Sequence, residues 1–166
     1  MSDLSDERID SLVKQLGRLL LDQELFLTTA ESCTGGGIAE ALTREPGSSR
    51  WFDCGFVTYS NDAKTHLLNV PESLFDIVGP GAVSEETALA MARGALANCR
   101  ANIAVATTGI AGPDGGSKDK PVGTVWIGWQ WSGQHLAKKF QFKGDRQEVR
   151  RASIVAALDG LVALLD

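Results

Sequence analysis

Apolar positions near both ends of the chain recur with the spacing of one helical face. In residues 4–23 this spacing predicts an amphipathic helix. Its apolar positions are Ile9, Leu12, Val13, Leu16, Leu19 and Leu20. A second helix is predicted from Asp145, which has the capping-box spacing to Glu148 that satisfies the first free N–H groups of a helix. Its apolar face is supplied by Val155, Leu158, Leu161, Val162 and Leu165.

Between these helices, short apolar and β-branched runs alternate with helical segments. Strands are predicted at residues 25–30, 51–59, 103–108, 122–131 and 136–142. Helices are predicted at residues 38–42 and 61–68 and after the N-cap Ser84, with Leu89, Ala92, Leu96 and Cys99 as the buried stripe of the third. This alternation predicts an α/β fold in one domain, residues 1–166, built as a three-layer α/β/α sandwich. Because Ser132-Gly133 is typical of a hairpin turn, we expect a mixed, mostly parallel sheet.

Composition and charge narrow the classes of function. The net charge is −5 with both signs interspersed, so the chain lacks the basic face of a duplex DNA binder. The three cysteines are scattered, without CxxC spacing, which argues against a disulfide framework and against a structural zinc site. The polar N-terminus does not resemble a signal peptide, and no apolar run reaches the roughly 20 residues of a membrane span. We therefore expect a reduced, cytoplasmic protein that does not bind membranes.

A serine precedes three glycines at the point where a predicted strand gives way to a helix. Ser32 stands just before the run at residues 35–37, where each glycine costs about 1 kcal/mol relative to alanine in a helix. Bare N–H groups at such a turn can bind an anion or an oxyanion, and open α/β sheets bind ligands at this edge. Capping and close packing explain the same residues equally well, and the segment is neither GxSxG nor SxxK.

A serine nucleophile needs a base, and Lys64 is the strongest candidate. His66 lies within a predicted helix and His135 in the predicted hairpin turn, where exposed surface roles are more common than catalysis. A lysine can act as the base when partial desolvation lowers its pKa. Lys64 opens a short helix after the strand that ends at Tyr59, on the same predicted rim as Ser32. A solvent-facing lysine is the simpler alternative.

Seven segments in order resemble the CinA C-terminal (PncC-type) domain family. They are ESCTGG at 31–36, GSSRWF at 47–52, GFVTYSN at 55–61, GAVS at 81–84, TGIAGPDGG at 108–116, KPVGTV at 120–125 and GDR at 144–146. The resemblance spans roughly residues 7–165. It implies an α/β/α sandwich and hydrolysis of nicotinamide mononucleotide to nicotinate mononucleotide and ammonia, in pyridine nucleotide recycling. Some family members carry an additional N-terminal domain, which we do not expect in this protein.

The resemblance also implies roles for particular residues. The nucleophile falls on Ser32, its lysine on Lys64 and a basic residue on Arg146. The tyrosine falls on Tyr59, which is expected to be catalytic as well, since either it or Lys64 could return a proton to the departing ammonia. Backbone N–H groups of Cys33, Thr34, Gly35 and Gly36 are then expected to stabilise the oxyanion. Arg146, in the first turn of a helix, suits a phosphate group, although a surface arginine is an equal alternative. Further substrate contacts are expected from Thr108, Gly109, Asp114 and Ser48. No metal or organic cofactor is required by this chemistry, and self-association is expected on family grounds.

Several alternatives remain at this point. The glycines of residues 109–116 match neither a Walker loop nor GxGxxG, and they also suit a simple turn. Trp126, Trp129 and Trp131 could stack on a pyridine ring, but alternation favours packing of the last two within the sheet. An amidase for a related substrate is one rival function. A non-catalytic partner in competence or recombination is another, against which the acidic balance weighs.

Overall fold

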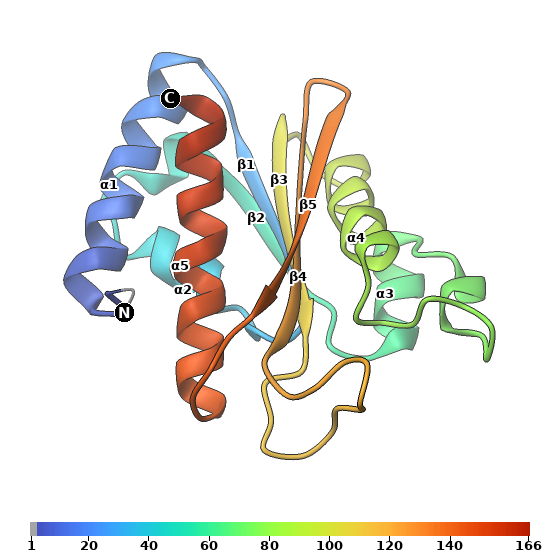
Figure 1. Cartoon of the computed structure of the whole chain (residues 1–166). Coiled ribbons are helices and arrows are strands. Elements are labelled where there is room, and N and C mark those ends of the chain that lie inside the picture. The colour runs from blue at the N-terminus through green and yellow to red at the C-terminus, as the bar shows by residue number, and fades with distance from the viewer. Residues whose placement is uncertain (1–2) are drawn as a thin grey trace.

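The fold of this chain is a five-stranded sheet covered by helices on both faces, as Figure 1 shows for a computed structural model that describes residues 3–166. The strands are β1 (Leu27–Glu31), β2 (Phe52–Val57), β3 (Ile103–Gly109), β4 (Thr124–Trp131) and β5 (Gln134–Gln141). The helices are α1 (Asp6–Asp22), α2 (Gly37–Thr43), α3 (Asn61–Leu68), α4 (Glu85–Ala97) and α5 (Arg146–Leu165). Two short 3₁₀ helices are η1 (Ser48–Arg50) and η2 (Glu72–Phe75). The predicted α/β class is confirmed.

The strand order is β2-β1-β3-β4-β5. Strands β2, β1 and β3 are mutually parallel, whereas β4 pairs antiparallel with both β3 and β5, so the sheet is mixed as predicted. From β1 the chain first crosses to β2 on one side and then to β3 on the other. The carboxyl ends of β1 and β3 therefore flank a topological switch point, where open α/β sheets form their ligand sites.

Two layers of helices enclose this sheet. In Figure 1, α1, α2 and α5 cover one face and α3 and α4 cover the other. The larger core lies under the first layer and includes Trp51 and Trp129, each at most 2% exposed. The Trp129 ring donates its N–H to the carbonyl of Ala157 in α5 at 3.2 Å, so this tryptophan packs between the sheet and the helix.

Helix α4 packs against the sheet mainly through small residues, and not through the leucines of the predicted stripe. Of the predicted stripe, Ala92 is fully buried, whereas Leu89, Leu96 and Cys99 are only half-buried, and small residues such as Ala88 face the strands. At Gly128 of β4, an added Cβ would lie 3.1 Å from the backbone of Ala88. Small side chains on both surfaces permit this close approach, and the prediction was wrong for the two leucines and the cysteine of this face.

Local capping and turn signals agree with the structure. Ser60 and Ser84 cap α3 and α4, and Asp145 forms the predicted capping box with Glu148. Ser132 and Gly133 both have positive φ, as a two-residue hairpin turn requires. His135 lies in β5 rather than in that turn. Among residues 3–166, no helix combines the length and the apolar character needed to cross a membrane.

Candidate active site

Ser32 follows directly after β1 and lies at the carboxyl edge of the parallel strands. Its N–H donates to the carbonyl of Thr107 in β3 at 3.0 Å, which ties the residue to the neighbouring strand. Ser32 is 7% exposed. Gly35 and Gly36 have φ values of 60° and 93°, a left-handed conformation that favours glycine, and they turn the chain into α2.

The side chain of Lys64 extends from α3 to Ser32. It lies in the first turn of α3, and its side chain is 1% exposed. Its Nζ lies 2.9 Å from Ser32 Oγ, 2.9 Å from the carbonyl oxygen of Thr58 and 3.1 Å from that of Tyr59. The residues predicted as a nucleophile and its base are thus in direct hydrogen-bond contact.

The partners of Lys64 determine how its amine is oriented. Carbonyl oxygens only accept hydrogen bonds, so two N–H groups point at Thr58 and Tyr59. Burial lowers the pKa of Lys64 to about 8, because the desolvated ammonium is disfavoured. Once the third proton is lost, the lone pair of the neutral amine faces the Ser32 hydroxyl. This arrangement can accept the proton of an attacking serine.

The N–H groups of the turn after Ser32 divide into used and available donors. Gly35 N–H donates to the carbonyl of Ser32 at 3.0 Å, so the expectation that it stabilises an oxyanion is corrected. Within the described part of the chain, no carbonyl or carboxylate oxygen accepts from the N–H of Cys33, Thr34 or Gly36. Those three groups remain candidates for binding a developing negative charge.

The buried carboxylate of Glu31 supports this turn. Glu31 is 0% exposed. One of its oxygens accepts from Ile38 N–H at 2.8 Å and from the Thr34 hydroxyl at 2.7 Å. The other accepts from Ala39 N–H at 3.0 Å and from the Thr29 hydroxyl at 3.4 Å. A glutamate seven residues before a helical N–H is no recognised capping pattern, so only the fold reveals this contact.

Tyr59 and Arg146 meet at the rim of the site. The Arg146 guanidinium donates to the Tyr59 hydroxyl at 3.1 Å and to the carbonyl of Gly112 at 2.7 Å. Both side chains are exposed, and Tyr59 is 62% exposed. Tyr59 contacts the Ser32–Lys64 pair through its backbone carbonyl, while its hydroxyl points to the rim. Arg146 opens α5, where the helix dipole adds positive potential.

The other predicted contacts divide into two groups. Thr108 and Gly109, at the end of β3, line the pocket, and the Thr108 hydroxyl donates to the carbonyl of Ala82 at 2.7 Å. Asp114 is exposed in the loop between β3 and β4 and does not line the pocket. Ser48 lies in η1, before β2 begins, and therefore at the opposite edge of the sheet. The expected substrate contact of Ser48 is corrected accordingly, whereas that of Asp114 stays a prediction.

These residues surround a pocket of about 160 Å³. It is lined by Ser32, Cys33, Tyr59, Asn61, Lys64, Ala82, Val83, Thr108, Gly109, Ala111 and Arg146. Burial raises the pKa of the Cys33 thiol to about 12, so this side chain stays protonated near neutral pH and is no second nucleophile.

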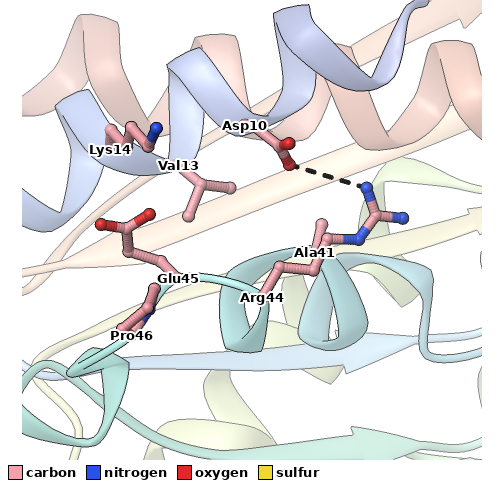
Figure 2. A pocket seen from close by; sticks show the side chains of 7 residues that line it. All are labelled: Asp10, Val13, Lys14, Ala41, Arg44, Glu45 and Pro46. Atoms are coloured by element: carbon pink, nitrogen blue, oxygen red, sulfur yellow. Dashed lines mark ion pairs between the residues drawn. The ribbon is translucent and has the colours of Figure 1, made fainter.

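Other features of the chain offer less chemistry. A larger hollow of about 370 Å³ lies between α1 and the end of α2 (Figure 2), where Asp10 and Arg44 form an ion pair at 3.6 Å. No hydroxyl or thiol side chain lines it. Among the described residues, one group has metal-ligand spacing, Asp53, Cys54 and Cys99, whose ligand atoms lie within 4.8 Å of one another. Both carboxylate oxygens of that group already accept hydrogen bonds from Arg100.

Comparison with known sequences connects this site to a family. The CinA C-terminal domain family matches residues 9–165. The chain is 56% identical over 156 residues to the nicotinamide-nucleotide amidohydrolase PncC of Pseudomonas putida, covering 94% of this chain and 96% of that protein. It is 46% identical over 159 residues to the protein of the same name from Escherichia coli K12, with 95% of each covered. A CinA-like protein of Geotalea uraniireducens is 50% identical, but the match spans only 36% of its length.

Solved structures show the same fold. The competence/damage inducible protein CihA of Agrobacterium tumefaciens superposes with a TM-score of 0.90 at 47% identity, over 96% of each chain. A CinA superfamily protein of Escherichia coli superposes with a TM-score of 0.91 at 37% identity, over 98% of this chain and 94% of that one. The five-stranded sheet and its helical layers are therefore common to these proteins.

Proposed function

Because the chain belongs to the CinA C-terminal domain family, we propose that it hydrolyses the carboxamide of nicotinamide mononucleotide to nicotinate mononucleotide and ammonia. The observation that carries this proposal is the 2.9 Å contact between Lys64 Nζ and Ser32 Oγ inside a shielded pocket. The relatives named as nicotinamide-nucleotide amidohydrolases support the choice of substrate.

The chemistry begins with the neutral amine of Lys64. It accepts the proton of Ser32 as Oγ attacks the carboxamide carbon, and the carbonyl oxygen becomes an oxyanion facing the N–H groups of Cys33 and Thr34. Collapse of this tetrahedral species breaks the C–N bond, and Lys64 returns its proton to the departing ammonia. A water molecule then attacks the acyl-enzyme and gives a proton to Lys64, which passes it to Ser32 Oγ as the acyl C–O bond breaks. The product leaves as a carboxylic acid that ionises in solvent, and the Ser32 hydroxyl and the neutral Lys64 amine are restored.

The dimensions of the pocket suit only part of a mononucleotide. Its volume of about 160 Å³ is below the roughly 300–1,000 Å³ of sites that enclose a whole ligand of this size. The pyridine carboxamide is then the enclosed part, and the phosphate extends to the rim. Arg146 supplies the positive charge at that rim, in the first turn of α5. We propose that this guanidinium binds the phosphate.

The decisive experiment measures ammonia release from nicotinamide mononucleotide by the wild-type protein and by Ser32→Ala and Lys64→Ala. We expect release by the wild type and a loss of at least about 10³-fold in both variants, as for other nucleophile–base pairs. Ser11→Ala and Lys14→Ala, at exposed positions of α1, are the matched controls and should retain full activity. A Ser32→Ala protein with wild-type turnover would refute the assignment.

The same preparation separates the rival functions. Nicotinamide riboside and free nicotinamide, assayed in parallel, test whether a related amide is the preferred substrate. Salt-dependent nucleic-acid binding without ammonia release would instead favour a competence or recombination role. We also propose a cytoplasmic location, which the three free cysteines support, and a homo-oligomeric state, which light scattering tests.

A further inference from the structure

We infer that Glu31 is a positioning residue that makes the Cys33–Thr34 backbone, rather than the N-terminus of α2, the oxyanion site. This inference rests on the proposed function. Glu31 does not line the pocket and is 0% exposed, so it cannot touch the substrate. Its influence on the reaction must pass through the backbone that it holds.

The first effect of Glu31 is to occupy the start of α2. An uncapped helix start offers its free N–H groups and its positive dipole end to an anion. Here the carboxylate accepts from Ile38 N–H at 2.8 Å and from Ala39 N–H at 3.0 Å. The protein's own anion therefore neutralises this helix end. A substrate oxyanion must find its donors earlier in the chain, in the turn itself.

The second effect is to hold that turn in place. The Thr34 hydroxyl donates to Glu31 at 2.7 Å and also lies 2.8 Å from the Thr107 hydroxyl of β3. Since the hydroxyl of Thr34 has a single proton, Thr107 is the donor in the second contact. From the other side, Arg150 of α5 donates to the carbonyl of Thr34 at 3.0 Å. Thr34 is thus held by the sheet, the carboxylate and a neighbouring helix.

The result is a defined direction for the available donors. The carbonyl of Ser32 points into the turn, where it accepts from Gly35 N–H at 3.0 Å. In a planar trans peptide the N–H points opposite to the carbonyl. The N–H of Cys33, on the same peptide as that carbonyl, therefore points out of the turn. Loosening Thr34 would let this peptide rotate and would weaken oxyanion binding without removing the nucleophile or its base.

Glu31→Gln is the sharpest test, because it keeps size and shape but replaces one acceptor oxygen with an NH₂ donor. That NH₂ group would face the N–H of Ile38 or of Ala39, and two donors cannot form a hydrogen bond with each other. We expect kcat for ammonia release from nicotinamide mononucleotide to fall by about 10²-fold, the usual loss for one oxyanion donor, with KM changed less than about threefold. The pH midpoint set by Lys64 should not move. Glu40→Gln, at an exposed site on α2, is the matched control.

A second probe separates this inference from the choice of substrate. A fluorophosphonate forms a P–O bond with Ser32 Oγ, loses fluoride and passes the serine proton to Lys64, and its phosphonyl oxygen occupies the oxyanion site. Wild-type labelling without ammonia release would refute the proposed substrate alone. We expect Glu31→Gln to slow labelling by a factor similar to its loss in kcat. Thr34→Val, which keeps the carboxylate but removes one tether, should show a smaller loss and decides the matter if Glu31→Gln does not fold.

Three results would overturn the inference. The first is wild-type labelling and turnover in a folded Glu31→Gln protein. The second is a shift of the pH midpoint in that variant, which would show that Glu31 acts on the proton of Lys64. The third is a loss confined to KM, which would indicate damage to substrate binding rather than to the oxyanion site.

Discussion

Lys64 should impose a pH dependence on the amidase reaction, because only its neutral form can accept the Ser32 proton. Burial lowers its pKa from 10.5 to about 8. At pH 7 a lysine with an ordinary pKa is neutral in about 0.03% of molecules, whereas one with a pKa of about 8 is neutral in about 9%. Desolvation of this one side chain thus increases the reactive fraction about 300-fold.

The measurement is kcat/KM for ammonia release between pH 6 and pH 9.5. The neutral fraction rises about 90-fold from pH 6 to pH 9, so kcat/KM should increase about tenfold per pH unit at first and level off above pH 8. Lys64→Arg should abolish activity at every pH, because a guanidinium stays protonated. His66→Asn, on the same helix, removes an exposed imidazole and should leave the profile unchanged.

A thermodynamic measurement checks the same pKa without catalysis. The folded pKa lies below the unfolded one, so between pH 8 and pH 10.5 the unfolded state holds more protons and the free energy of unfolding rises with pH. Relative to Lys64→Met, the wild type should gain about 2 kcal/mol of stability between pH 7 and pH 9.5. A flat kcat/KM profile, or the absence of this gain, would refute the neutral-lysine mechanism.

The remaining predictions concern the rim and the packing. Arg146→Ala should reduce the ratio of kcat/KM for nicotinamide mononucleotide to that for the riboside by about 10–100-fold, which corresponds to the free energy of one hydrogen bond to a charged group. An unchanged ratio would show that Arg146 does not bind the phosphate. Gly94→Ala should destabilise the protein by about 3 kcal/mol in urea unfolding, because the new Cβ would lie 2.0 Å from the Leu68 carbonyl oxygen. Trp129→Phe should cost about 1–3 kcal/mol through the lost bond to Ala157 while kcat is unaffected; a fall in kcat without lost stability contradicts this.

Much of the fold was predictable because its signals act over a few residues. The apolar spacing of α1 and α5, the capping box at Asp145 and the two-residue turn at Ser132 depend on neighbours within one or two helical turns or a single hairpin. Helix α4 was predicted from its N-cap, but most of its buried face was not, because that face consists mainly of small residues whose burial depends on how closely the sheet approaches.

The sequence by itself therefore determined the elements, their order and the glycine turn after Ser32. It also supplied the resemblance that pointed to Lys64. Only the tertiary structure decided which groups meet. Lys64 lies 32 positions after Ser32. Their contact exists because β1 and β2 are adjacent and parallel, so that the segment after β1, with Ser32, and the segment after β2, with Lys64, leave the sheet at the same edge.

The same tertiary arrangement separated Ser48 and Asp114 from the pocket. It also buried Glu31 against the start of α2, a contact that no local pattern signals. Periodicity and capping are encoded by interactions along a few residues of chain. The partners of a buried polar group are selected by strand order and helix packing, which bring distant segments together and decide which donors and acceptors remain free.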